Sequence, residues 1–112
     1  MKILHILSQR PDSTGSGIYL QAMLREAAKH GHQNYLVAGV ECEQPADLGD
    51  IEGACCRYLS FGETGELPFP IVGMSDVMPY ESSRFCALSE KQLDAYEESF
   101  RRRVNEAVET FK

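Results

Sequence analysis

The chain has 112 residues, with 17 acidic against 11 basic side chains and a formal net charge of −6. Its length and its 43% hydrophobic content suit one hydrophobic core, so we expect a single domain over residues 1–112. The acidic balance disfavours nucleic acid as a partner, because phosphodiester backbones repel it. No apolar run is long enough for a transmembrane segment, and the first is too short for a signal peptide. We therefore expect a cytoplasmic protein.

The first forty residues predict a strand, a helix and a second strand. Residues 2–8 form a short apolar run that is typical of a strand buried on both faces. Residues 18–30 carry apolar side chains at the spacing of one helix face, and Gly31 follows where a helix C-cap favours glycine. Residues 34–38 indicate the next strand. This order predicts a right-handed βαβ unit in a parallel sheet.

Between the first strand and the helix stand Gly15, Ser16 and Gly17. Glycines allow a ligand to approach the backbone, and the N–H groups that begin a helix favour an anion. The dinucleotide fingerprint is not met, because Leu20 occupies the third glycine position and the glycines begin several residues beyond the strand. Anion binding and a plain connection both remain open from these residues alone.

The middle of the chain is less regular. Residues 41–53 are polar and acidic, which indicates a surface connection, and residues 54–61 predict a third strand. Glycines and prolines in residues 62–73 disfavour a long regular element. In the segment that follows, Asp76 and Tyr80 are candidates for contact with a ligand, although a packed connection is the more common role of such a loop.

The last element is a helix that begins with a capping box of Ser89 and Gln92. Its apolar stripe is expected to lie in the core and consists of Leu93, Tyr96, Phe100, Val104, Ala107, Val108 and Phe111. The basic triplet at 101–103 lies among glutamates, so we interpret it as a solvated face with pairs along the helix.

The four cysteines have no Cys-x-x-Cys spacing and do not cluster with the histidines. Cys55 and Cys56 are adjacent and would point to opposite faces of a strand, which opposes joint ligation of one metal. We expect reduced thiols, no metal site and no cofactor.

Several short motifs together carry a resemblance to a known family. The chain opens on Lys-Ile-Leu-His-Ile at 2–6, and Gly-Ser-Gly-Ile follows at 15–18. Leu-Arg-Glu-Ala at 24–27 and Lys-His-Gly-His-Gln at 29–33 lead into the second expected strand. In this order and spacing they resemble the opening of the family 4 glycosyltransferases. Residues 74–80 and 96–112 also resemble the corresponding segments of this family, so the resemblance spans nearly the whole chain.

The resemblance implies a three-layer Rossmann-like domain, the N-terminal domain of a GT-B enzyme. Such enzymes transfer a sugar from a nucleotide-sugar donor to a glycan or other acceptor, commonly without a required metal. The matched loop of Gly15, Ser16 and Gly17 would lie close to the donor diphosphate, although many members have two adjacent glycines there. The implied sheet has strand order 3-2-1 with the fourth strand missing. The basic pair and glutamate-rich motif that hold the donor are absent from this sequence.

The resemblance therefore predicts the front part of an acceptor-side domain, truncated and inactive alone, with no residue in a catalytic role. Without a fourth strand, residues 2–8 would form an apolar open edge. We expect a homodimer that covers this edge or the stripe of Tyr96, Phe100 and Val104 on the last helix. Two other functions stay open: a small module that binds phosphate or a nucleotide without catalysis, and a structural or interaction domain.

Overall fold

The computed structural model describes residues 1–13, 15–41, 54–73 and 78–111. The elements are the strands β1 (Lys2–Leu7), β2 (Gln33–Glu41), β3 (Ala54–Phe61), β4 (Ile71–Gly73) and β5 (Ser82–Arg84), the helices α1 (Gly15–Lys29) and α2 (Glu90–Thr110), and a short 3-10 turn, Phe85–Ala87. Among these residues, no helix is both long and apolar enough to cross a membrane.

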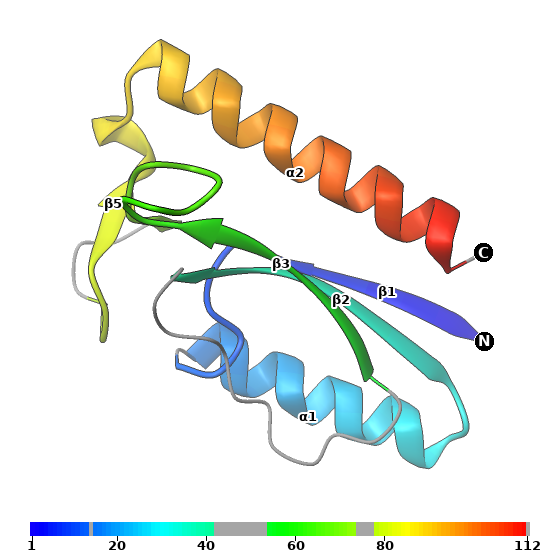
Figure 1. Cartoon of the computed structure of the whole chain (residues 1–112). Helices are drawn as coiled ribbons and strands as arrows, with labels where there is room; N and C mark the ends of the chain where they lie inside the picture. Colours follow the sequence, from blue (N-terminus) through cyan, green and yellow to red (C-terminus); the bar gives the residue numbers. More distant parts are fainter. Residues whose placement is uncertain (14, 42–53, 74–77, 112) are drawn as a thin grey trace.

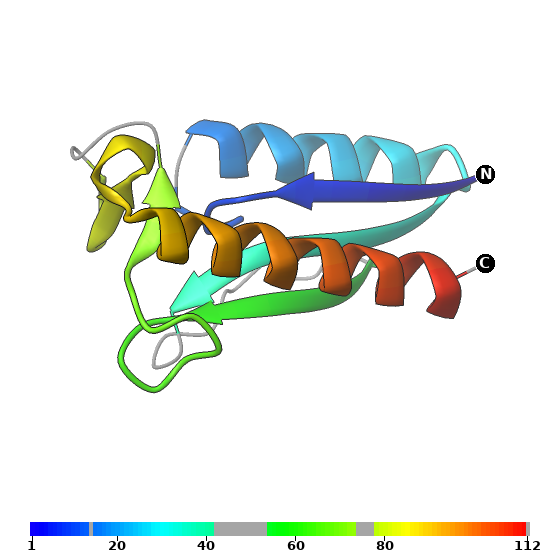
Figure 2. The same cartoon turned by 90° about the horizontal axis from the view of Figure 1, so that it is seen from above.

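The main sheet is parallel, in the order β1-β2-β3. Helix α1 covers one face and α2 the other, which gives three layers (Figures 1 and 2). The expected α/β fold with strand order 3-2-1 is thus confirmed. The first strand and residues 54–61 match their predicted extents closely, whereas β2 is longer than predicted. Short β4 and β5 form a second, parallel pair that the sequence analysis did not predict.

Each face of the sheet has its own hydrophobic cluster. On the α1 face, Leu20 and Leu24 of the helix pack with Leu36 and Ala38 of β2. On the α2 face, the buried residues come from β3, β4 and the segment between them: Leu59, Phe61, Leu67, Phe69, Ile71 and Val72. Since both faces of β2 are covered, six of its nine residues are buried, as expected of a central parallel strand.

Helix α2 begins as predicted, with both hydrogen bonds of the Ser89–Gln92 capping box formed. Its apolar stripe, however, is only partly buried, which corrects the expectation that all of it lies in the core. Leu93 is 39% and Val108 48% exposed. The side of α2 that the sheet buries is offset from the stripe, because Ser99 and Ala107 are the buried residues of the helix, whereas Tyr96, Phe100 and Val104 are only half-buried.

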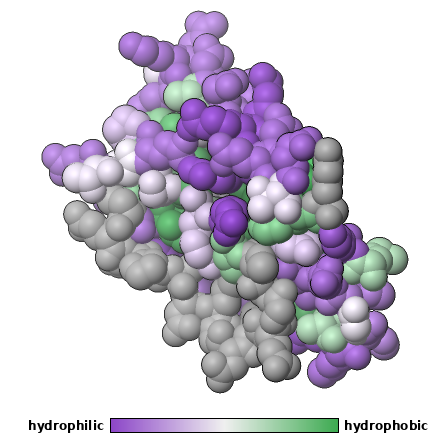
Figure 3. Space-filling model, turned by 45° about the vertical axis from the view of Figure 1, so that its right-hand side comes forward, coloured by the Kyte–Doolittle hydropathy of each residue, from purple (hydrophilic) through white to green (hydrophobic). Residues whose placement is uncertain are grey.

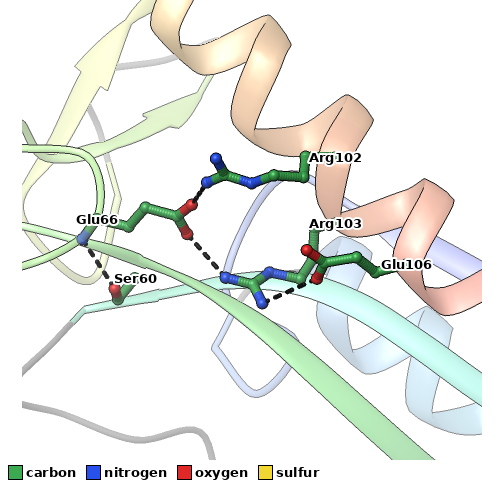
Figure 4. A network of polar contacts seen from close by, with 5 residues as sticks. All are labelled: Ser60, Glu66, Arg102, Arg103 and Glu106. Atoms are coloured by element: carbon green, nitrogen blue, oxygen red, sulfur yellow. Dashed lines mark hydrogen bonds and ion pairs between the residues drawn. The ribbon is translucent and has the colours of Figure 1, made fainter.

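The basic triplet agrees with its prediction only in part. Arg101 pairs with Glu97 and Arg103 with Glu106 along the helix, as expected, but Arg102 and Arg103 also both bind Glu66, which precedes β4 (Figure 4). Arg103 Nη2 donates to Glu66 Oε2 at 2.9 Å, and the backbone N–H of Glu66 donates to Ser60 Oγ at 3.0 Å. The triplet therefore links α2 to the segment after β3. Periodicity along one helix cannot reveal this pairing, because the acidic partner is 36 and 37 residues away.

Two smaller predictions concern the helix end and the thiols. Gly31 has φ +78, the left-handed conformation expected after α1. Cys56 and Cys86 are free thiols, while Cys42 and the side chain of Cys55 lie outside the described residues.

The face of the molecule drawn in Figure 3 is mostly hydrophilic, with hydrophobic residues in small separate areas.

Candidate functional site

Helix α1 starts beside the carboxyl end of β1, where open α/β sheets bind ligands (Figure 1). It begins at Gly15, three residues earlier than predicted, so Gly15, Ser16 and Gly17 form its first turn rather than a loop. Glycine has a low intrinsic helix propensity, which is why the sequence favours a loop at these positions. Close packing on the preceding segment overrides that preference at Gly17.

Gly17 is buried against the chain that leads into the helix. A Cβ at this position would lie 2.7 Å from the carbonyl oxygen of Pro11 and 3.0 Å from that of Arg10. Gln21, one turn further on, donates from Nε2 to the same Pro11 oxygen at 2.8 Å. The lack of a side chain at Gly17 thus lets α1 approach the backbone of residues 10 and 11. The diphosphate contact predicted for Gly17 stays a prediction, beside this packing role.

Gly15 and Ser16 are in a different environment, because both are exposed. No atom lies within 4 Å of the position that a Cβ on Gly15 would occupy. The two residues border a groove of about 530 Å³ between the first turn of α1 and β1, and His5, Ile6, Leu7, Tyr19, Leu20 and Met23 line the rest of it. A ligand in this groove would meet the exposed N-terminal turn of α1, whose dipole favours negative charge.

The orientation of His5 in this groove is set by a buried amide. Asn34, which is 1% exposed, donates from Nδ2 to the carbonyl oxygen of Leu24 at 3.0 Å. Its Oδ1 then accepts from Nε2 of His5, also at 3.0 Å. In the neutral ring this assignment leaves Nδ1 as an acceptor. His5 could not be predicted as a site residue, because a lone histidine within an apolar run gives no signal of its partner on another strand.

A buried ion cluster adjoins the start of α1. Arg10, 5% exposed, donates from Nε and Nη2 to the two carboxylate oxygens of Asp12 at 3.1 and 3.0 Å, and its Nη1 is 3.9 Å from Oε1 of Glu41. Ser13 donates to Asp12 as well, at 2.9 Å. The two carboxylates more than neutralise the guanidinium. Arg10 therefore holds the turn together, and its fork is not open to a phosphate.

Asp76 and Tyr80 were predicted as ligand contacts, and the structure describes only Tyr80. Asp76 lies outside the described residues. Tyr80 lies against Arg10 in the ion cluster; burial raises the pKa of its phenol, and the Arg10 backbone and guanidinium oppose that rise. Tyr58 of β3 is close to the same cluster, and burial followed by Cys56 and Asp12 raises its pKa well above the usual range. The structure thus brings Tyr80 to the carboxyl end of the sheet, next to the turn before α1.

The cluster of Arg10, Asp12 and Glu41 is what sequence reasoning missed. The only local signal was the Arg-Pro-Asp order after the first strand, and Glu41 comes from the end of the second. A second hollow of about 470 Å³ shares Glu41 with this cluster. Its other lining residues are Glu63, Glu81, Phe61, Gly62, Pro68, Phe69 and Pro70. Within the described ranges, no group of three or more His, Cys, Asp or Glu is placed to hold a metal ion.

Comparisons with protein-family models, with curated proteins and with solved structures gave no match.

Proposed function

We propose that the chain is the front part of the acceptor-side domain of a glycosyltransferase that uses a nucleotide-sugar, and that it is inactive alone. The observation that carries the proposal is the open, exposed first turn of α1 at the carboxyl end of a parallel sheet. The order of sequence motifs that resemble family 4 glycosyltransferases supports it further. In this proposal the donor diphosphate approaches Gly15 and Ser16, and the acceptor lies toward Tyr80.

The electrostatics of this site explain why the chain alone would bind a diphosphate weakly. Helix N-terminal charge stabilisation is worth at most about 2 kcal/mol, which corresponds to a dissociation constant of about 30 mM. No side chain among the cluster residues adds free positive charge, because Asp12 and Glu41 occupy Arg10. Strong donor binding would then have to come from a second domain, and catalysis with it.

The test is an amide NMR titration of the chain with uridine, guanosine and adenosine diphosphates up to about 60 mM, which is about twice the dissociation constant of about 30 mM expected from the helix terminus alone. We expect the shifts to centre on Gly15 and Ser16 and to be lost in Gly15→Val, whose side chain would fill the open space. Ala22→Val is the matched control, since Ala22 is exposed on the same helix away from the groove.

Two other outcomes would change the assignment. Micromolar binding of a nucleoside diphosphate by the chain alone would favour a small nucleotide-binding module over half of an enzyme. Release of nucleoside diphosphate from a nucleotide-sugar by the isolated chain would contradict the inactivity. If Gly15→Val and Gly17→Val leave every binding property unchanged, a structural or interaction domain is the better assignment.

A further inference from the structure

We propose that β1 pairs, antiparallel and about a two-fold axis, with β1 of a second copy of this chain. The two sheets would then continue into one six-stranded sheet. The proposal concerns the edge of the sheet and the apolar grooves beside it. One of these is the groove that Gly15 and Ser16 border, so a partner strand would compete there with the proposed diphosphate.

The two outer strands of the main sheet differ in how they are protected. On β3, Arg57 places an exposed cation along the edge, and the segment after the strand folds back over its end. There, Leu67 donates its N–H to the Ser60 carbonyl at 3.1 Å and accepts from Gly62 at 3.0 Å. Strand β1 has one charged residue, Lys2 at its start, and none from position 3 to position 7, and it pairs only with β2 in the part of the chain described. Charges and covering loops are the usual protection of sheet edges, so β1 is the unprotected one.

The alternation of the strand shows which backbone groups face outward. The carbonyl oxygen of Met1 accepts from the N–H of Gln33 at 2.9 Å. In a parallel ladder every second residue bonds to the same neighbour, so residues 3, 5 and 7 turn their N–H and C=O groups toward β2. The groups of Leu4 and Ile6 therefore face the open edge. A partner strand would pair with these two residues.

Apolar grooves lie on both sides of this edge. The groove beside α1 is the one bordered by Tyr19, which is 69% exposed, and Met23. The groove beside α2 has about 430 Å³ and is lined by Ile6 and Ser8 of the β1 side with Tyr96, Phe100, Val104 and three polar residues. Ile6 belongs to both grooves and is 55% exposed. An added strand with apolar side chains on both faces would fill the two grooves together.

Strand β1 itself has the properties that this edge requires of a partner. Its Leu4 and Ile6 lie on the α2 face and its Leu7 packs on the α1 face, so a copy would offer apolar side chains to both grooves. The strand carries no acidic residue, which reduces repulsion between two chains of charge −6. The rim of the α2 groove carries both signs of charge, from Glu97 and Arg101. A two-fold axis closes the assembly at two chains and leaves no new open edge at β1.

The test is sedimentation equilibrium of the full chain from 5 to about 500 µM, a range that brackets ordinary dimer affinities. We expect a dimer whose dissociation constant rises at least tenfold in Ile6→Lys, which places a charge in both grooves. Val108→Lys is the control, because Val108 is comparably exposed on α2 but borders neither groove. Circular dichroism of both variants checks that the fold is kept.

Amide hydrogen exchange gives a second readout within one chain. The N–H groups of Leu4 and Ile6 should become more protected as the protein concentration rises, whereas those of residues 3, 5 and 7, turned toward β2, should not change. A monomer at about 500 µM would overturn the proposal. So would a dimer that Ile6→Lys leaves intact, or exchange at Leu4 and Ile6 that is independent of concentration.

Discussion

Two glycines of the first turn of α1, only two residues apart, should respond in opposite ways to the same substitution. At Gly17 a Cβ would meet the Pro11 carbonyl carbon at 2.8 Å and its oxygen at 2.7 Å. Both are backbone atoms, so they cannot rotate away as the end of a side chain could. Gln21 and the Arg10–Asp12 pair fix this backbone further.

The magnitude follows from two opposing effects. Overpacking at a well-packed site costs about 1–3 kcal/mol, while alanine is favoured over glycine in a helix by at most about 1 kcal/mol. Gly17→Ala should therefore lower the free energy of unfolding by about 1–2 kcal/mol. Gly15→Ala meets no atom within 4 Å, so only the propensity effect remains, and stability should rise by about 0.5 kcal/mol.

Urea denaturation of the two variants and the parent chain measures this difference. With a slope of about 1–3 kcal/mol per molar urea, the midpoints of the two variants should lie about 1 M apart, with Gly15→Ala the higher. Circular dichroism at 222 nm follows the transition. Equal midpoints, or a Gly17→Ala variant as stable as the parent, would refute the close approach of α1 to residues 10 and 11.

Three further predictions concern stability. Asp12→Asn leaves the buried Arg10 without its bidentate partner and should lower the free energy of unfolding by about 3 kcal/mol. The double variant Asp12→Asn with Arg10→Met should lower it by less, because no unpaired charge stays buried; chemical denaturation measures both variants. Burial raises the pKa of Tyr58, so its phenol ionises more readily in the unfolded chain. The contribution of Tyr58 to stability should therefore be constant below about pH 10 and be lost as the pH rises above it. Denaturation from pH 8 to 11.5 tests this, because stability should fall less steeply with pH in Tyr58→Phe than in the parent chain. Glu66→Gln removes the carboxylate that Arg103 binds and should cost about 1 kcal/mol, with Glu63→Gln, an exposed neighbour, as the control.

The elements with strong local signals were predictable from the sequence. The apolar run of β1, the periodicity of α1 and the capping box at Ser89 each depend on residues close in the chain, and the structure confirms the three elements. The expectation that β1 is buried on both faces was wrong, because the strand lies at the edge of the sheet and none of its residues is fully buried. The layer order followed from the βαβ pattern, because the handedness of the connection leaves few alternatives.

The features that the sequence did not reveal depend on contacts between distant segments. The helical state of the Gly15 turn results from packing of Gly17 on Pro11, and the partners of Arg102 and Arg103 come from beyond α2. The ion cluster around Arg10 joins the ends of two strands. Such pairings have no period along the chain, and they form only once the sheet has brought its carboxyl ends together.

In the proposed function, the first turn of α1 receives the diphosphate of a nucleotide-sugar donor. Its most direct test compares the amide NMR shifts caused by uridine diphosphate with those caused by uridine at the same concentration. We expect shifts at Gly15 and Ser16 with the diphosphate and none there with the nucleoside. Equal shifts with both compounds, or shifts confined to the hollow of Glu41, Glu63 and Glu81, would contradict it.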